Sequence, residues 1–521
     1  MSETHDDADL STAEVGPAPR QVDSTGALQL DLVLGGGVPR GALLMVVGPP
    51  GSGKTTLAAQ MAFAAARTGR DALILTALSE PTSKLIAHLR AFTFFDEALV
   101  GGPVRILSLE QFLPQGLAST GEELLALARE ERASLVLLDG FSGVRGADSD
   151  PQAARQFLYR VGSALSARGT TTLITSEATP RDQALFPEAT TADIIIGLHY
   201  SLDGVRQRRG IEVVKTRGGA PLLGLHGLAL NGDGAIVYPR LEATVRAAGP
   251  TTVAVASATR VSSGVPVLDT LLGGGFNQAT TTLIAGSLGV GKTFLGLHFA
   301  LAGLRAGESV VFVGFRETEE QLLLKADVLA DGATLRAALE PDGGLTFLQW
   351  PPVELDPDIV ADEILATLDR TGARRLVVDS VAALERAASA LDPRRVDEYL
   401  AALVVALRMR GVTTLVIREA RRTVAEDSDL DDPVSMMADT VIVLRQVVVD
   451  NRLRRTLAVV KMRFSAHDVA LHEFHIATPQ GIQLQPFSSS TTVAATLDPT
   501  PENRQADGEG QAARARPEET A

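Results

Sequence analysis

Gly48-Pro49-Pro50-Gly51-Ser52-Gly53-Lys54-Thr55 sets the architecture of this chain, and Gly286-Ser287-Leu288-Gly289-Val290-Gly291-Lys292-Thr293 repeats its pattern 238 positions later. Both satisfy G-x-x-x-x-G-K-[ST], the P-loop that wraps the phosphates of a nucleotide. Glycines let backbone N–H groups turn toward the anion, and the N-terminus of the following helix adds a favourable dipole. The lysine reaches the outer phosphates, and the threonine hydroxyl is placed to bind Mg²⁺.

The residues on either side of each loop indicate its place in the fold. Residues 42–47 and 280–285 are apolar or β-branched runs that predict buried parallel strands, whereas residues 55–67 and 293–305 predict helices. A strand and a helix on the correct sides favour a nucleotide site over a simple glycine-rich turn. The residues that we expect to bind the nucleotide are Gly48, Gly51, Ser52, Gly53, Lys54, Thr55, Thr56, Gly286, Gly289, Val290, Gly291, Lys292, Thr293 and Phe294.

Length and composition bound the class of protein. At 521 residues the chain is too long for one ordinary core, and the repeated loop predicts two large domains. Hydrophobic residues at 45% and charged residues at 21% are typical of a soluble globular protein. The absence of cysteine excludes disulfides, thiolate catalysis and cysteine-based zinc sites, and eight histidines offer little for a structural metal site.

Charge and the first residues of the chain bear on partners and location. A net charge of −15 weighs against binding to duplex DNA, which needs a basic face, so we do not expect a nucleic-acid partner. The two densest basic clusters, residues 206–209 and 452–455, recur at matching places, as hairpin tips or subunit contacts would. A signal peptide would start with basic residues followed by an apolar stretch, whereas residues 1–10 are acidic. No apolar run is long enough to span a bilayer. We therefore expect a cytoplasmic protein without a membrane partner.

Two aspartates occupy matching positions in the two halves. Asp139 ends one apolar run and Asp379 ends another, 85 and 87 residues after the respective loop lysines. An aspartate at the carboxyl end of a buried strand that faces a phosphate loop usually helps to hold Mg²⁺, and a strand-end cap is the alternative. The predicted metal-binding residues are Thr55 with Asp139, and Thr293 with Asp379.

Further landmarks recur in the same order and define the fold class. Strand-like runs at residues 171–175 and 192–196 match runs at 413–417 and 438–442. Strands alternating with helical stretches predict an α/β fold, with a mostly parallel sheet that is covered on both faces and closed by antiparallel strands near the basic clusters. The predicted organisation is a disordered tail (1–24), a first domain (25–245), a linker (246–258), a second domain (259–486) and a disordered acidic tail (487–521).

The duplicated P-loop domain resembles the KaiC family of RecA-like ATPases. The resemblance is carried by a repeated K-x-R pair, Lys215-Thr216-Arg217 and Lys461-Met462-Arg463. It is also carried by Leu34-Gly35-Gly36-Gly37 and Leu272-Gly273-Gly274-Gly275, which precede the two loops. It is strongest around Arg260-Val261-Ser262-Ser263-Gly264 and Ala466-His467. It implies two tandem RecA-like domains and a double-ring homohexamer that binds ATP and Mg²⁺ between neighbouring subunits.

That assembly suggests a role for the K-x-R pairs. Residues at i and i+2 of a strand share a face, so Lys215 with Arg217, and Lys461 with Arg463, are placed to project together toward the γ-phosphate of a neighbouring subunit. A solvated strand face with surface ion pairs is the alternative.

The sequence departs from the family at two chemically important places. The family carries adjacent glutamates after the strand that follows the P-loop helix, and the first is the usual base; here those positions are Ser79-Glu80 and Arg316-Glu317. Serine or arginine cannot replace that base, so Glu80 and Glu317 take its role or turnover is slow.

The second departure concerns phosphoryl transfer to the protein itself. Known members phosphorylate an adjacent Ser-Thr pair in the second lobe, where this chain has Ser435-Met436, which leaves Ser435 as the candidate and an ordinary loop serine as the alternative. We therefore expect a slow, ring-shaped ATPase that acts as a switch for an unidentified regulatory protein. A serine autokinase and a nucleotide-stabilised scaffold remain alternatives.

Overall fold

The computed structural model describes residues 21–76, 81–113, 116–141, 143, 151–179, 187–249, 257–419, 433–449 and 451–488. Contacts divide the chain into two compact units. The first comprises Met1–Val253, Glu354–Thr367 and Ala387–Ala406, and the second comprises Ala254–Val353, Leu368–Arg386 and Leu407–Ala521. The first unit contains one nine-stranded sheet and the second contains another. We call the regions built around these sheets the first and the second lobe.

The first lobe is an α/β fold with a mostly parallel sheet. Its strand order is β11-β10-β9-β8-β3-β7-β6-β4-β5. Neighbouring strands pair in parallel from β8 through β3, β7, β6 and β4 to β5, and they pair antiparallel from β8 through β9 and β10 to β11. Its strands are β3 (Leu43–Val47), β4 (Ala72–Thr76), β5 (Val104–Ser108), β6 (Leu135–Asp139), β7 (Thr171–Ser176), β8 (Ile194–Asp203), β9 (Arg206–Thr216), β10 (His226–Asn231) and β11 (Gly234–Tyr238). Its helices are α1 (Leu30–Leu34), α2 (Lys54–Arg67), α3 (Thr82–Leu89), α4 (Leu117–Glu130), α6 (Pro151–Ser166) and α7 (Leu241–Ala247).

The second lobe repeats this topology strand for strand. Its order, β16-β15-β17-β18-β14-β19-β20-β21-β22, is the first order read from the other edge, which confirms the predicted duplication. Its strands are β14 (Thr281–Gly286), β15 (Val310–Gly314), β16 (Leu345–Gln349), β17 (Arg375–Asp379), β18 (Thr413–Glu419), β19 (Thr440–Val449), β20 (Arg452–Met462), β21 (His472–Ala477) and β22 (Gly481–Pro486). Its helices are α8 (Pro266–Leu271), α9 (Lys292–Arg305), α10 (Glu319–Val328), α11 (Gly332–Leu339) and α15 (Pro433–Met437). Helices α12 (Pro357–Thr371), α13 (Ala382–Leu391) and α14 (Arg395–Met409) each have residues in both compact units.

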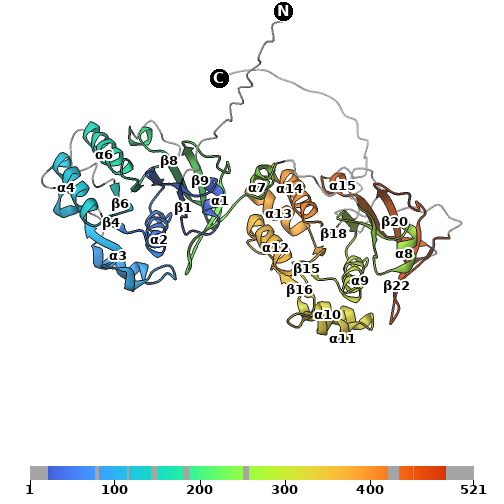
Figure 1. Cartoon of the computed structure of the whole chain (residues 1–521). Helices are drawn as coiled ribbons and strands as arrows, with labels where there is room; N and C mark the ends of the chain where they lie inside the picture. Colours follow the sequence, from blue (N-terminus) through green and yellow to red (C-terminus); the bar gives the residue numbers. More distant parts are fainter. Residues whose placement is uncertain are drawn as a thin grey trace, which may run out of the picture. The chain divides into compact units, whose positions relative to one another are not determined.

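The central strands are apolar on both faces because helices cover both faces of the sheet. Along β3, Leu44 and Val46 pack on the side of α2, whereas Leu43 and Met45 pack on the side of α4 and α6. Figure 1 shows α2 and the α4–α6 pair on opposite sides of the first sheet. This alternation produces the continuous hydrophobic runs from which the buried parallel strands were predicted.

Short antiparallel pairs precede each P-loop strand. β1 (Val22–Asp23) pairs with β2 (Val38–Pro39), and β12 (Ser257–Val261) pairs with β13 (Phe276–Gln278). Helix α7 ends at Ala247 and strand β12 begins at Ser257, so two residues at each end of the predicted linker 246–258 belong to these elements. The other domain boundaries remain predictions, and the predicted tails lie outside the described residues except for 21–24 and 487–488.

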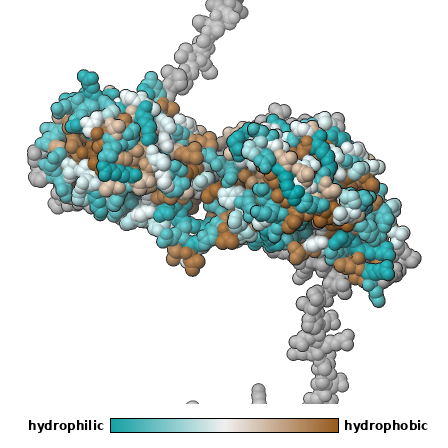
Figure 2. Space-filling view, turned by 90° about the horizontal axis from the view of Figure 1, so that it is seen from below, coloured by the Kyte–Doolittle hydropathy of each residue, from teal (hydrophilic) through white to brown (hydrophobic). Residues whose placement is uncertain are grey.

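The surface agrees with the composition. Within the ranges that the structure describes, no helix is long and apolar enough to cross a membrane. Figure 2 shows hydrophilic and hydrophobic residues interspersed on one face of the molecule. The basic clusters lie at hairpin tips as predicted, because β9 begins at Arg206 and β20 begins at Arg452, directly after the turns from β8 and β19.

Candidate functional site

Each P-loop connects a central strand to a helix, as predicted. β3 leads into the first loop and α2 begins at Lys54; β14 leads into the second and α9 begins at Lys292. The residues before these helices, Gly53 and Gly291, have left-handed φ values of 101° and 113°. No side chain caps either helix, so the N–H groups of the first turn remain available to an anion.

Steric crowding explains the glycines that begin the loops. A Cβ atom added to Gly48 would lie 2.6 Å from the carbonyl oxygen of Leu198, and one added to Gly286 would lie 2.5 Å from that of Leu444. Both neighbours are backbone atoms of the adjacent strand and cannot move aside. The pattern is therefore required by the packing of each loop against its own sheet.

The loop lysines fold back over their loops. In the second lobe, Lys292 Nζ donates to the carbonyl oxygens of Gly286 at 2.9 Å and Ser287 at 2.7 Å. Lys54 Nζ makes the two equivalent bonds in the first lobe, each at 2.9 Å. Burial lowers the pKa of both lysines, and nearby carboxylates oppose that shift. Binding of a polyanion beside these amines would favour their charged form.

The threonine and aspartate predicted to hold Mg²⁺ are in contact in both lobes. Thr293 Oγ1 donates to Asp379 Oδ2 at 2.7 Å, and Thr55 Oγ1 donates to the Asp139 carboxylate at 3.0 Å. Thr175 Oγ1 donates to the same carboxylate at 2.6 Å and fixes its orientation. Burial raises the pKa of Asp379, mainly through desolvation of its carboxylate.

These oxygen atoms fit a magnesium ion that is shared with phosphates. Mg²⁺ is usually held by one or two carboxylates together with substrate phosphates and water, rather than by a cage of protein ligands. The described residues contain no group of three or more His, Asp or Glu side chains that could hold a metal alone. A hydroxyl and a carboxylate beside a phosphate loop match the shared type of site.

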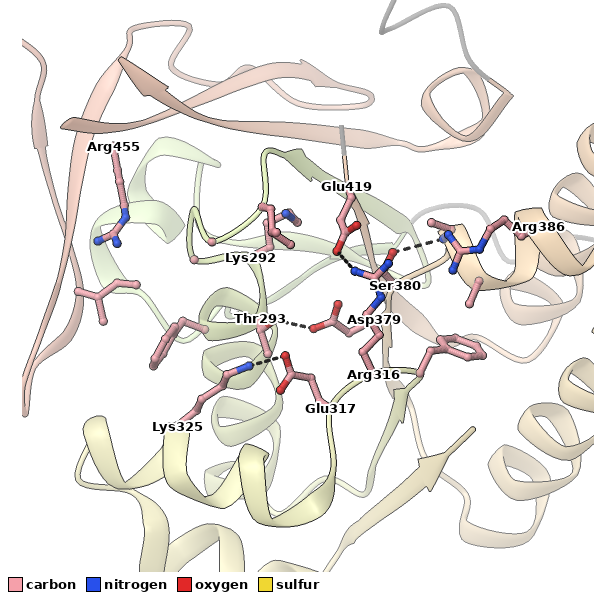
Figure 3. A pocket seen from close by; sticks show the side chains of 18 residues that line it. Lys292, Thr293, Arg316, Glu317, Lys325, Asp379, Ser380, Arg386, Glu419 and Arg455 are labelled. Atoms are coloured by element: carbon pink, nitrogen blue, oxygen red, sulfur yellow. Dashed lines mark hydrogen bonds and ion pairs between the residues drawn. The ribbon is translucent and has the colours of Figure 1, made fainter. Parts of the chain in front are cut away.

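A cavity of about 350 Å³ lies beside the second P-loop, within the range of ligand-binding sites. Figure 3 shows its side chains converging from the loop, from the carboxyl ends of the central strands and from α10. Five basic and three acidic side chains line it, so the lining carries an excess of positive charge that suits a polyphosphate. These eight residues are Lys292, Arg316, Glu317, Lys325, Asp379, Arg386, Glu419 and Arg455.

Glu317, the candidate base of the second lobe, lines this cavity. A capping box at Thr318 and Gln321 starts α10 directly after it and fixes where its side chain emerges. Lys325, from the same helix, holds its carboxylate at 2.6 Å. Glu80, the corresponding candidate of the first lobe, lies outside the described residues.

Arg316, at the position of the missing first glutamate, donates to Glu419 Oε1 at 2.8 Å (Figure 3). Glu419 is a site residue that motif reasoning missed, as are Lys325, Arg386 and Arg455. A signal for Glu419 was present, because it ends the strand beside β14 and therefore reaches the phosphate loop. The contribution of Arg455 depends on how β20 packs, which no local pattern reveals.

The K-x-R pairs each face one backbone segment of their own chain. Lys461 Nζ donates to the carbonyl oxygens of Ser435 at 2.9 Å and Met436 at 3.1 Å, and Arg463 donates to the latter at 3.1 Å. In the first lobe both cations similarly donate to the carbonyl of Thr190. The two cations of each pair therefore contact the same backbone segment before β8 or β19, and their projection toward a neighbouring subunit stays a prediction.

Ser435 lies in the short helix α15 and is 4% exposed. Its neighbour Met436 is 57% exposed. The side chain at the position of the family's phosphorylated serine is thus buried, and the exposed side chain beside it has no hydroxyl group.

Known proteins resemble this chain along nearly its whole length. The KaiC ATPase family model matches residues 24–242 and again residues 261–489. "Circadian clock protein KaiC3" of Synechocystis is 26% identical over 489 residues, which cover 90% of this chain and 93% of that protein. "Circadian clock oscillator protein KaiC" of Parathermosynechococcus lividus is 26% identical over 492 residues, with coverage of 92% and 87%. Two matched domains, two copies of one sheet and two P-loops with their aspartates show that this chain is an ATP-binding member of the KaiC family of ATPases.

Proposed function

We propose that this protein is a Mg²⁺-dependent ATPase that binds ATP at both P-loops and hydrolyses it slowly within a ring of identical subunits. The observation that carries the proposal is the repeated arrangement of a loop lysine beside a hydrogen-bonded threonine–aspartate pair. Two independent copies of this geometry support two nucleotide sites. Similarity to KaiC proteins supports assembly into a ring, and nucleotide state would then change its shape for a protein partner.

The proposed chemistry relies on charge neutralisation and positioning. Lys54 and Lys292 would contact the outer phosphates, while Thr55 with Asp139 and Thr293 with Asp379 would hold Mg²⁺. When bound, Mg²⁺ neutralises charge on the β- and γ-phosphates. Water attacks the γ-phosphorus as the bond to the bridging oxygen breaks, which yields ADP and phosphate. In the second lobe Glu317 would orient that water and accept its proton.

We expect slow turnover because the Glu317 carboxylate is already in an ion pair. A general base needs an available lone pair within hydrogen-bond reach of the proton that it removes. Lys325 holds one oxygen of the Glu317 carboxylate at 2.6 Å, so the base must act through its other oxygen and is restrained in one orientation, which we expect to slow turnover. The same observation favours the alternative of a nucleotide-stabilised scaffold in the second lobe.

Solution mass and phosphate release test the proposal together. With Mg·ATP we expect the chain to form a ring, hexameric by analogy with the family, and to release phosphate slowly in a reaction that needs Mg²⁺. Light scattering and a phosphate assay, each repeated with EDTA, provide the measurements. A monomer under both conditions with no phosphate release would contradict the proposal, whereas retained ATP without release would identify the scaffold alternative.

Ser435 is expected to remain unmodified. Its side chain is buried in α15, so its hydroxyl cannot approach a γ-phosphate without opening of that segment. Intact-mass analysis after incubation with Mg·ATP should show no added phosphate, and Ser435→Ala should leave the mass spectrum otherwise unchanged. A phosphate that appears in the original chain and is lost in Ser435→Ala would establish the autokinase alternative.

A further inference from the structure

Arg316 stands where the family carries its first glutamate, and its guanidinium lies inside the phosphate cavity. It lines the cavity with Lys292, and it donates to Glu419 at 2.8 Å. Burial lowers the pKa of Lys292, and the negative charge of Glu419, which lines the same cavity, opposes that shift. The Arg316–Glu419 pair is therefore close to the amine that contacts the outer phosphates.

The bond that holds Arg316 is weak enough to be exchanged. Its side chain is 56% exposed and that of Glu419 is 30% exposed. Ion pairs in such positions contribute little because water screens them. An arginine–phosphate contact is charge-assisted on both sides and can be bidentate, so it is the stronger of the two.

Lys325, the basic residue of α10, does not compete for this role. Lys325 is held by Glu317 at 2.6 Å, and both side chains are only 26% exposed. Arg316 is thus a half-exposed cation in the cavity beside the second P-loop, and its present partner is a partly exposed carboxylate.

We propose that Arg316 leaves Glu419 for the terminal phosphate of ATP, so that the second lobe distinguishes ATP from ADP through a residue of its own chain. This inference rests on the proposed function, because it requires that the cavity bind nucleotide. No covalent step is involved. The arginine changes one ionic partner for another, and ADP does not offer the second partner.

Calorimetric titration of the full chain with Mg·ATP and Mg·ADP tests the proposal. Lys54→Ala in every chain confines binding to the second lobe. Arg316→Gln is then expected to weaken ATP binding about tenfold, as loss of a charge-assisted contact would, and to leave ADP binding within about twofold. Equal weakening of both nucleotides, or of neither, would overturn the proposal.

Arg336→Gln is the matched control. Arg336 is 53% exposed and donates to Asp327 at 2.7 Å, so it is an ion-paired arginine of similar exposure in the same lobe. It does not line the cavity. Its loss should leave both affinities unchanged, which separates a specific contact from a change in net charge.

Glu419→Gln provides an independent arm. Removal of the competing carboxylate should raise the preference for ATP over ADP, and this gain should disappear when Arg316→Gln is also present. A gain that persists without Arg316 would contradict the proposed exchange. Failure of the proposed function would look different, since the Lys54→Ala chain would then bind neither nucleotide.

Discussion

A chain that carries both Lys54→Ala and Lys292→Ala is expected to lose ATP turnover by about 100-fold or more, because catalysis at each site depends on a preorganised positive charge at the phosphates. Each amine is held over its loop by two backbone hydrogen bonds, which place its positive charge where the outer phosphates would bind. The measurement is phosphate release with Mg·ATP in excess, accompanied by nucleotide-binding assays.

The single variants divide this effect between the lobes. Lys54→Ala should remove the contribution of the first lobe, and Lys292→Ala that of the second. Lys84→Ala, which alters an exposed lysine of α3, serves as the control and should retain turnover. Unchanged phosphate release in the double variant would refute hydrolysis at these loops and with it the proposed function.

Lys461→Ala combined with Arg463→Ala is expected to reduce turnover of the second lobe by about 1,000-fold, the effect of losing cationic groups that a neighbouring subunit supplies to a γ-phosphate. In the isolated chain these cations hold the segment around Met436 instead. A loss of activity alone would therefore not separate a role across the interface from a role in folding of that segment.

Mixed rings separate the two roles. One chain carries Lys292→Ala, the other carries Lys461→Ala with Arg463→Ala, and both carry Lys54→Ala to silence the first lobe. Neither forms an active ring alone. In a mixed ring, an intact Lys292 site borders a neighbour that supplies intact cations, so activity should return in part. If mixing restores nothing, the pair acts within its own chain.

Local patterns were sufficient for the framework of this protein. The P-loops, their flanking strands and helices, and the strand-end aspartates depend on runs of a few residues whose backbone demands are strict. Leu44 and Met45, for example, face opposite helical layers, so a run of apolar residues was a reliable sign of a doubly covered strand.

The ionic network of the second site was much harder to foresee. The sequence identified Arg316 as a departure from the family and Glu317 as a candidate base. It gave no sign that Glu419 pairs with Arg316 or that Lys325 pairs with Glu317. Glu419 lies 103 residues after Arg316 in the sequence, and Lys325 lies about two turns of helix after Glu317. Such contacts depend on which strands are neighbours and on the direction in which α10 leaves the sheet.

The amino-acid order alone thus specified two P-loop modules and the threonine and aspartate that meet beside each loop, because backbone geometry and strand burial leave a local signature. Folding in three dimensions was needed to decide which charges neutralise each other around the cavity beside the second P-loop and to bury Ser435. The reason is physical: ion pairing and burial depend on distances between segments, and a sequence pattern records only distances along the chain.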